Sequence, residues 1–179
     1  MTSRGGGRLA HLLDEVEKAG AELARDPRPA EGQDAARRLL RAVYEVGLAA
    51  GTDPTAAGRE ALDDAVRRTA PQLSRGSPAL AYAVVLLESR FYGSWEWDWR
   101  RAAEARSALQ FLLDLYRGTA LEAAYEALGT GELDEQMRFR GARDGHLSPA
   151  SIPEGIPTSH WWWWAPDEPP TTPTASRAP

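Results

Sequence analysis

The chain has 179 residues, of which 42% are hydrophobic and 26% charged, with a formal net charge of -5 and no cysteine. These values are typical of one globular domain with a short appendage, and they argue against a second full-sized domain. The lack of cysteine excludes disulfides, thiolate metal sites and cysteine nucleophiles. The acidic balance argues against binding to duplex nucleic acid, which depends on clustered cations.

The N-terminal residues reach charged side chains before any apolar run that is long enough for a signal peptide. No stretch of the sequence approaches the length of a membrane span. We therefore expect a cytoplasmic protein with no membrane partner. Lys18 is the single lysine among 21 basic residues, which, together with the abundant alanine, is typical of a GC-rich bacterial genome.

Apolar side chains recur at helical spacing along most of the first 140 residues. Pairs or single residues such as Asp53-Pro54, Ser94 and Thr119 precede the apolar runs and are expected N-caps. Helices are predicted over about 7–25, 36–51, 54–69, 78–92, 94–116, 120–128 and 132–140. The sequence therefore predicts an all-α fold in which residues 1–140 form a compact bundle of about six to seven helices.

The composition changes at Gly141, because eight of the 13 prolines lie in the last 39 residues. Proline at this density is incompatible with a regular helix or a central strand. We therefore predict that residues 141–179 form an extended, proline-rich tail. This tail contains the sequence SHWWWWAP, with four consecutive tryptophans.

The four tryptophans cannot all be buried on one flat surface if the tail is extended. Trp161 and Trp163 would then face one side, and Trp162 and Trp164 the other. A groove is needed, and it can belong to the protein's own bundle, near Trp95 to Trp99, or to another protein. A free tract is the least favourable state, because exposed aromatic clusters promote aggregation.

Tryptophan is enriched at the energetic centres of protein interfaces. The predicted partner-binding residues are His160, Trp161, Trp162, Trp163, Trp164 and Pro166. Trp95, Trp97 and Trp99 form a second candidate aromatic surface, for which the alternative is a role in filling the space between two helices. His160 is either a pH-sensitive hydrogen-bonding group or a spacer.

The sequence predicts no catalytic residue, no metal site and no cofactor. His11, His146 and His160 are the only histidines, and none belongs to a Glu-x-x-His pair of the kind that holds metals in helical bundles. We expect His11 to be a solvated helix residue. Glu88 is the exception among the acidic residues, because it follows an apolar run in the most apolar predicted helix and has no obvious partner nearby.

The segment SHWWWWAP, following an alanine- and arginine-rich helical region, resembles that of small proteins encoded beside caspase-like proteases and TPR proteins in bacterial conflict systems. The resemblance rests on the tail and on the size of the chain, and no catalytic residue is carried over by it. It implies a non-enzymatic accessory protein that works through contacts with a protein partner.

Three hypotheses of function follow. The first is an α-helical, non-enzymatic interaction module that uses the tryptophan tract in cis or on a partner. The second is a small-molecule-binding or catalytic bundle whose tail closes a pocket over Glu88. The third is a single-stranded nucleic-acid binder that uses Trp97, Arg100 and Arg101.

Overall fold

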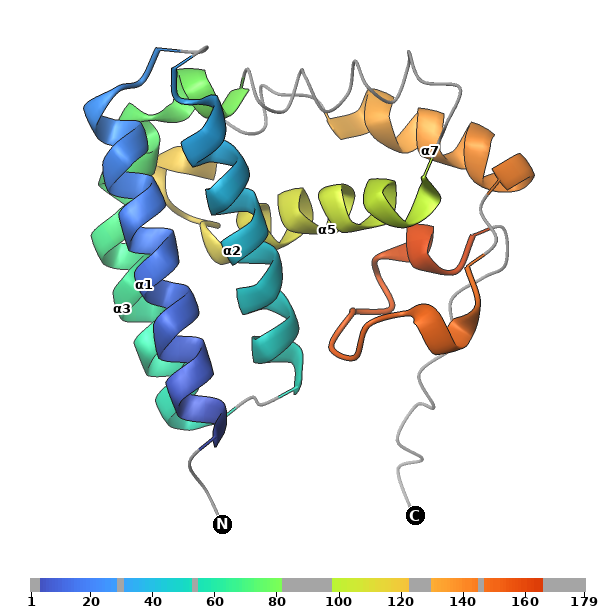
Figure 1. Cartoon of the computed structure of the whole chain (residues 1–179), viewed down its shortest axis with the longest axis horizontal. Helices are drawn as coiled ribbons and strands as arrows, with labels where there is room; N and C mark the ends of the chain where they lie inside the picture. The colour runs from blue at the N-terminus through green and yellow to red at the C-terminus, as the bar shows by residue number, and fades with distance from the viewer. Residues whose placement is uncertain are drawn as a thin grey trace.

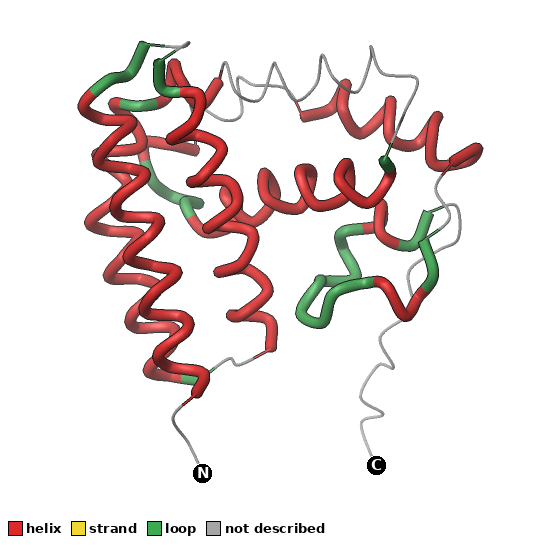
Figure 2. Tube along the Cα trace, in the orientation of Figure 1, coloured by secondary structure: helices red, strands yellow, loops and turns green. Residues whose placement is uncertain are grey.

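The computed structural model describes residues 4–28, 31–52, 55–81, 98–122, 130–144 and 147–165. The fold is all-α, as predicted, and no strand occurs among these residues (Figure 2). Within them, no helix is long and apolar enough to cross a membrane.

Three long helices stand side by side and form the first layer of the molecule (Figure 1). They are α1 (Arg4–Arg25), α2 (Gln33–Thr52) and α3 (Ala56–Arg75). Each turns an apolar stripe inward, which is why amphipathic sequences of this length form a bundle. The stripes include Leu13, Val16, Leu23, Leu39, Val43, Val46 and Leu73, all buried.

Helix α5 (Trp99–Leu115) runs across the three-helix layer and packs against α2 (Figure 1). Phe111 of α5 occupies the space beside Gly47, where a methyl group would overlap the phenyl ring. Just after the C-terminal end of α5, the Tyr116 hydroxyl lies 2.6 Å from Thr69 Oγ1 of α3. Thr69 donates its own proton to the Ala65 carbonyl, so Tyr116 is the donor, and burial raises the pKa of the Tyr116 phenol to about 12.

Helix α7 (Thr130–Asp144) and residues 147–165 lie on either side of the N-terminal half of α5 (Figure 1). Leu133, Met137 and Gly141, which are four residues apart, form the buried stripe of α7. The segment 147–165 contains the short 3₁₀ helices η1 (Pro149–Ser151) and η2 (Trp161–Trp163). Its Gly155 has φ +90° and contacts the backbone of Leu48 at the end of α2, a close approach that only glycine accommodates.

Two helix starts differ from the sequence prediction. Helix α3 begins at Ala56 and is capped by Thr55, whose side chain accepts a bond from the Gly58 amide; the predicted cap at Asp53-Pro54 lies outside the described residues. Helix α5 begins at Trp99, because Asp98 has extended dihedral angles and caps the Arg101 amide. The prediction of one continuous helix from Ser94 to Tyr116 is therefore wrong.

Two helix ends also lie beyond the predicted positions. Helix α3 continues through Pro71 to Arg75 instead of ending near Thr69. Helix α7 continues past Gly141 to Asp144, four residues into the predicted tail. Gly141 packs closely on Trp99: a Cβ atom at position 141 would stand 3.0 Å from Trp99 Cη2. This tertiary contact outweighs the low helix propensity of glycine, and the helix continues.

The expected N-cap at Thr119 forms, at the helical turn that begins at residue 120. Thr119 Oγ1 accepts a hydrogen bond from the Leu121 amide, and the Glu122 carboxylate accepts one of 2.6 Å from the Gly118 amide. Gly118 has φ +77°, in the left-handed region that favours glycine after a helix.

Candidate interaction site

The tryptophan tract packs against its own chain as a compact turn. Trp162 and Trp163 are 2% and 0% exposed, and His160 is 1% exposed. Trp161 and Trp164 are partly exposed. Successive side chains of a 3₁₀ helix are about 120° apart, so two neighbouring rings face inward, whereas an extended chain would bury alternate ones.

The surface that receives the tract is one face of α5. Trp99, Ala103, Ser107 and Phe111 follow one another at intervals of four residues and are all buried. This spacing places them in one row along the helix. Two small side chains therefore lie between two aromatic ones, and Trp99, Ser107 and Phe111 of this row contact residues 160–163.

Ser107 Oγ is the centre of the hydrogen-bond network. It lies 3.0 Å from Trp162 Nε1, 2.8 Å from Trp163 Nε1 and 3.0 Å from His160 Nδ1. An indole N–H can only donate, so the serine oxygen accepts from both tryptophans. Its own proton is then left for His160, and the hydroxyl makes all three of its hydrogen bonds inside the protein.

His160 lies within an aromatic stack beside Ser107. Its ring is 4.8 Å from the Trp162 ring at an interplanar angle of 24°, and 4.8 Å from the Phe111 ring. Burial, together with the positive charge of the nearby Arg106, lowers the pKa of the imidazole to about 4. The histidine is therefore neutral at pH 7.

Arg106 of α5 contacts both the tract and helix α7. Its guanidinium lies 4.5 Å from the centre of the Trp162 ring and makes two bonds to Asp134 of α7, of 2.7 Å and 3.1 Å. A third bond, of 3.2 Å, reaches Gln110. Trp99 Nε1 holds the tract backbone by donating to the Trp162 carbonyl over 2.9 Å.

The outer rings of the tract remain accessible. Trp161 meets Trp162 edge to face, with centroids 5.8 Å apart, and Arg138 of α7 lies 5.1 Å from the Trp161 ring centre. Trp164 packs against the rim of the core. The tract is thus a hydrogen-bonded turn that presents two of its four indoles.

The Ser107 and His160 pair does not have the arrangement of a catalytic dyad. A serine nucleophile needs an oxygen lone pair directed at a substrate, but both Ser107 lone pairs accept indole protons in a fully buried environment. The geometry is that of a structural hydrogen-bond centre.

Other residues singled out in the sequence fall into two groups. Five of them lie outside the described residues: Glu88, Trp95, Trp97, His146 and Pro166. Arg100 and Arg101 are on the surface of α5, where they pair with Glu104 and Asp98 at 3.1 Å and 3.2 Å. Trp99 alone of the second aromatic group is described, and it belongs to the tract's own binding face.

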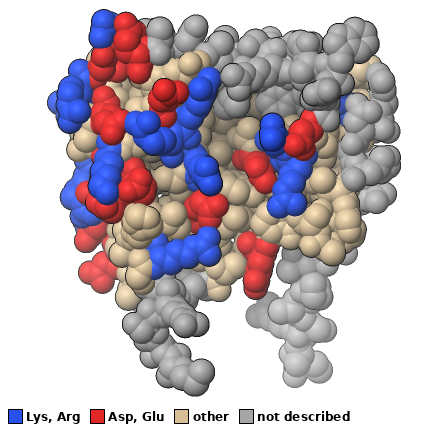
Figure 3. All heavy atoms as spheres, in the orientation of Figure 1, with Lys and Arg blue, Asp and Glu red and all other residues tan. Residues whose placement is uncertain are grey.

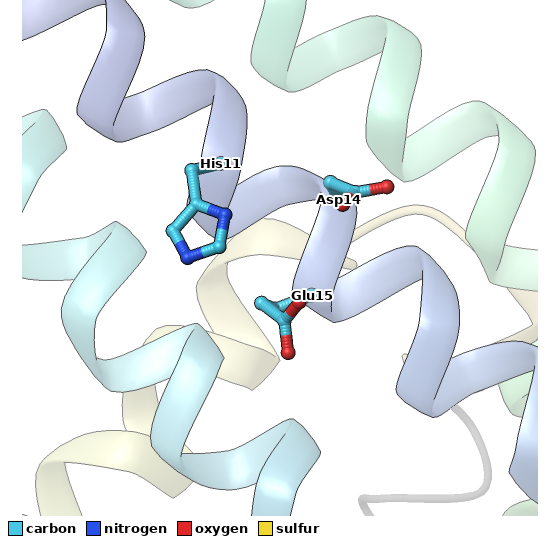
Figure 4. Close-up of side chains that lie close together, drawn as sticks. All are labelled: His11, Asp14 and Glu15. Atoms are coloured by element: carbon cyan, nitrogen blue, oxygen red, sulfur yellow. The ribbon is translucent and has the colours of Figure 1, made fainter.

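His11, Asp14 and Glu15 gather on the exposed side of α1, with ligand-type atoms within 4.8 Å of one another (Figure 4). Lys18 pairs with Asp14 at 2.8 Å and with Glu15 at 3.1 Å, and these bonds raise the pKa of its ammonium group. The lysine therefore occupies both carboxylates, and we interpret the cluster as a solvated ion-pair network.

A shallow groove of about 630 Å³ opens between α3 and the C-terminal end of α5. Its described lining is mostly charged and contains no residue of the tract: Arg59, Glu60, Asp63, Val66, Arg67, Leu115 and Arg117. Acidic and basic side chains are also interspersed over the visible face of the molecule (Figure 3).

Sequence reasoning missed Ser107, Arg106 and Asp134. The available signal was an arginine and a serine between apolar residues in the sequence of α5, since polar side chains inside a buried helix need partners. The partner of Ser107 lies 53 residues away in the sequence and that of Arg106 lies 28 residues away, so the sequence of α5 alone does not identify them.

Comparison with known protein families, curated proteins and solved structures finds no match to this chain.

Proposed function

We propose that the protein is a non-enzymatic interaction module, an accessory of a bacterial conflict or signalling system, which binds a protein partner through the outer rings of its tryptophan tract. The observation that carries this proposal is the division of the tract into two halves. Trp162 and Trp163 are held inside the fold by Ser107, whereas Trp161 and Trp164 remain at the surface.

The inner half supports the proposal because it makes the outer half rigid. A ring that is fixed before binding loses less conformational entropy when it docks. The backbone of the tract is held by bonds from Trp163 N to His160 O, of 3.1 Å, and from Trp164 N to Trp161 O, of 3.0 Å. Arg138 beside Trp161 adds the second residue type that is enriched in binding hot spots.

The chemistry of the site also favours binding over catalysis. Ser107 and Arg106, the polar side chains beside the tract, are engaged in hydrogen bonds, which are buried for Ser107 and partly buried for Arg106. The resemblance of SHWWWWAP to accessory proteins of conflict systems points in the same direction. A protein partner is therefore the expected ligand.

The test replaces the outer rings and keeps the inner ones. Full-length protein and the double variant Trp161→Ala/Trp164→Ala are used to capture partners from a lysate of the source bacterium, and a captured protein is then purified for affinity measurement. We expect the double variant to bind at least about 30-fold more weakly, because hot-spot tryptophans contribute 2 kcal/mol or more.

Phe139→Ala is the matched control, because Phe139 is a large aromatic residue that is 66% exposed on α7. Circular dichroism should show unchanged helicity in all three proteins. Equal affinity of the double variant and the wild type for the captured protein would rule out the tract surface as the binding site.

A further inference from the structure

The hydrogen bonds of Ser107 determine which nitrogen of His160 carries the proton. Both lone pairs of Ser107 Oγ accept from indoles, so the hydroxyl proton must point to His160 Nδ1, which lies 3.0 Å away. Nδ1 is therefore an acceptor, and in the neutral ring the proton is on Nε2. That nitrogen is buried and has no hydrogen-bond partner within the described part of the chain.

A protonated His160 is incompatible with this arrangement for two reasons. First, an N–H at Nδ1 would point at an oxygen whose lone pairs are already occupied, so one of the tract's hydrogen bonds must break. Second, the positive charge would lie between the Trp162 and Phe111 rings, out of water.

The charged and titratable groups around His160 do not offset this charge. Arg106 of α5 carries the same sign and contacts the same Trp162 ring. Asp134 of α7 accepts both of its bonds from Arg106, and Arg138 of α7 stands over Trp161. On the α2 side, the neutral Tyr44 packs against Phe111, which is the ring on the other side of His160 from Trp162.

We propose that residues 157–165 form a proton-controlled latch, which is docked on α5 while His160 is neutral and is released when His160 binds a proton. Release would expose Trp162 and Trp163 in addition to the outer rings. This inference concerns the tract's attachment to its own chain and does not require a partner, so it stands or falls independently of the proposed function.

The direction of the pH effect follows from the two protonation states. The pKa of His160 is about 4 when docked, against an ordinary value of 6.5. Docking is therefore at full strength above pH 6.5 and weakens as the pH falls toward 4. Since each unit of difference in pKa is a factor of ten, the full loss of about 300-fold is reached only below pH 4, and the docking equilibrium should weaken by about 100-fold between pH 7 and pH 4.

The experiment follows hydrogen exchange of the indole N–H groups in full-length protein labelled with ¹⁵N-tryptophan. The Trp162 and Trp163 signals are assigned with single Trp→Phe variants. Between pH 7 and pH 4 their protection, relative to the intrinsic exchange rate at each pH, should fall together by about 100-fold. Backbone amides in the buried stripe of α2 report on whether the bundle remains folded.

His160→Asn is the matched control, because asparagine can still offer an oxygen to Ser107 and does not titrate. Its indole protection should not depend on pH. The latch is refuted if wild-type protection is constant from pH 7 to pH 4, or if His160→Asn loses protection as the wild type does.

The His160 ring itself gives a second measurement that needs no variant to dock. Its ¹⁵N shifts in the wild type should show the tautomer with the proton on Nε2 and a pKa well below 6.5. A proton on Nδ1 at pH 7, or a pKa of 6.5 or higher, would overturn the proposal even if His160→Asn fails to dock.

Discussion

At the scale of single residues, one serine oxygen organises the tract. Ser107 Oγ makes three hydrogen bonds to residues of the tract, and each partner is itself buried. A buried group that loses its partner incurs the full desolvation penalty, which is larger than the net value of the bond. The loss of this one oxygen therefore affects three groups together.

We expect Ser107→Ala to lower the free energy of unfolding by about 3 kcal/mol, because two indole N–H groups and His160 Nδ1 are left without partners. Ser74→Ala is the control, since the Ser74 hydroxyl donates to the Ala70 carbonyl of its own helix and should contribute within about 0.5 kcal/mol. Urea unfolding followed by circular dichroism measures both. A cost for Ser107→Ala as small as that of the control would contradict the role assigned to this oxygen.

At the scale of secondary-structure elements, Arg106 attaches α7 to α5. The guanidinium is 4% exposed, and its partner Asp134 is 20% exposed. A buried ion pair adds little net stability over an apolar pair, but the loss of one partner leaves an uncompensated charge.

Asp134→Asn should therefore lower the free energy of unfolding by about 3 kcal/mol. The comparison variant is Asp114→Asn, which breaks the exposed Asp114–Arg117 pair, whose side chains are 45% and 71% exposed; we expect a change below about 1 kcal/mol there. Thermal unfolding at low and high salt distinguishes the two pairs, because only the exposed one is screened. Equal effects of the two substitutions would show that Arg106 tolerates the loss of Asp134.

The helices themselves were predictable, and their ends less so. Apolar periodicity identifies α1, α2 and α3 because each buries one continuous stripe. The start of α5 was misplaced because alternating tryptophans fit either a helix or a strand, and the position of the cap depends on the dihedral angles of Asp98. Helix α7 extends past Gly141 through contact with Trp99, which local sequence does not reveal.

At the scale of the whole molecule, the tract belongs to the core of the described protein. Gly155 meets the end of α2, Ser107 lies on α5, and Gly141 of α7 lies near Ala165. Four identical neighbouring residues have no periodicity, so the sequence left two locations open, the protein's own bundle and a partner. The choice depends on a row of side chains on α5 that is distant in the sequence, and its complementarity to the tract exists only after folding.

Ser107 and His160 are separated by 53 residues, so their bond closes a long loop, whereas α1 packs against α2, the next helix along the chain. Contacts between residues that are far apart in the sequence cost more chain entropy and tend to form late in folding.

We expect Trp163→Phe to accelerate unfolding with little effect on refolding, with a φ-value below about 0.3, and Leu39→Ala in α2 to give a larger φ-value. Stopped-flow kinetics in urea test this, and a φ-value near 1 for Trp163 would refute it. With a low φ-value, the aromatic turn determines how long a folded molecule survives more than how quickly it forms.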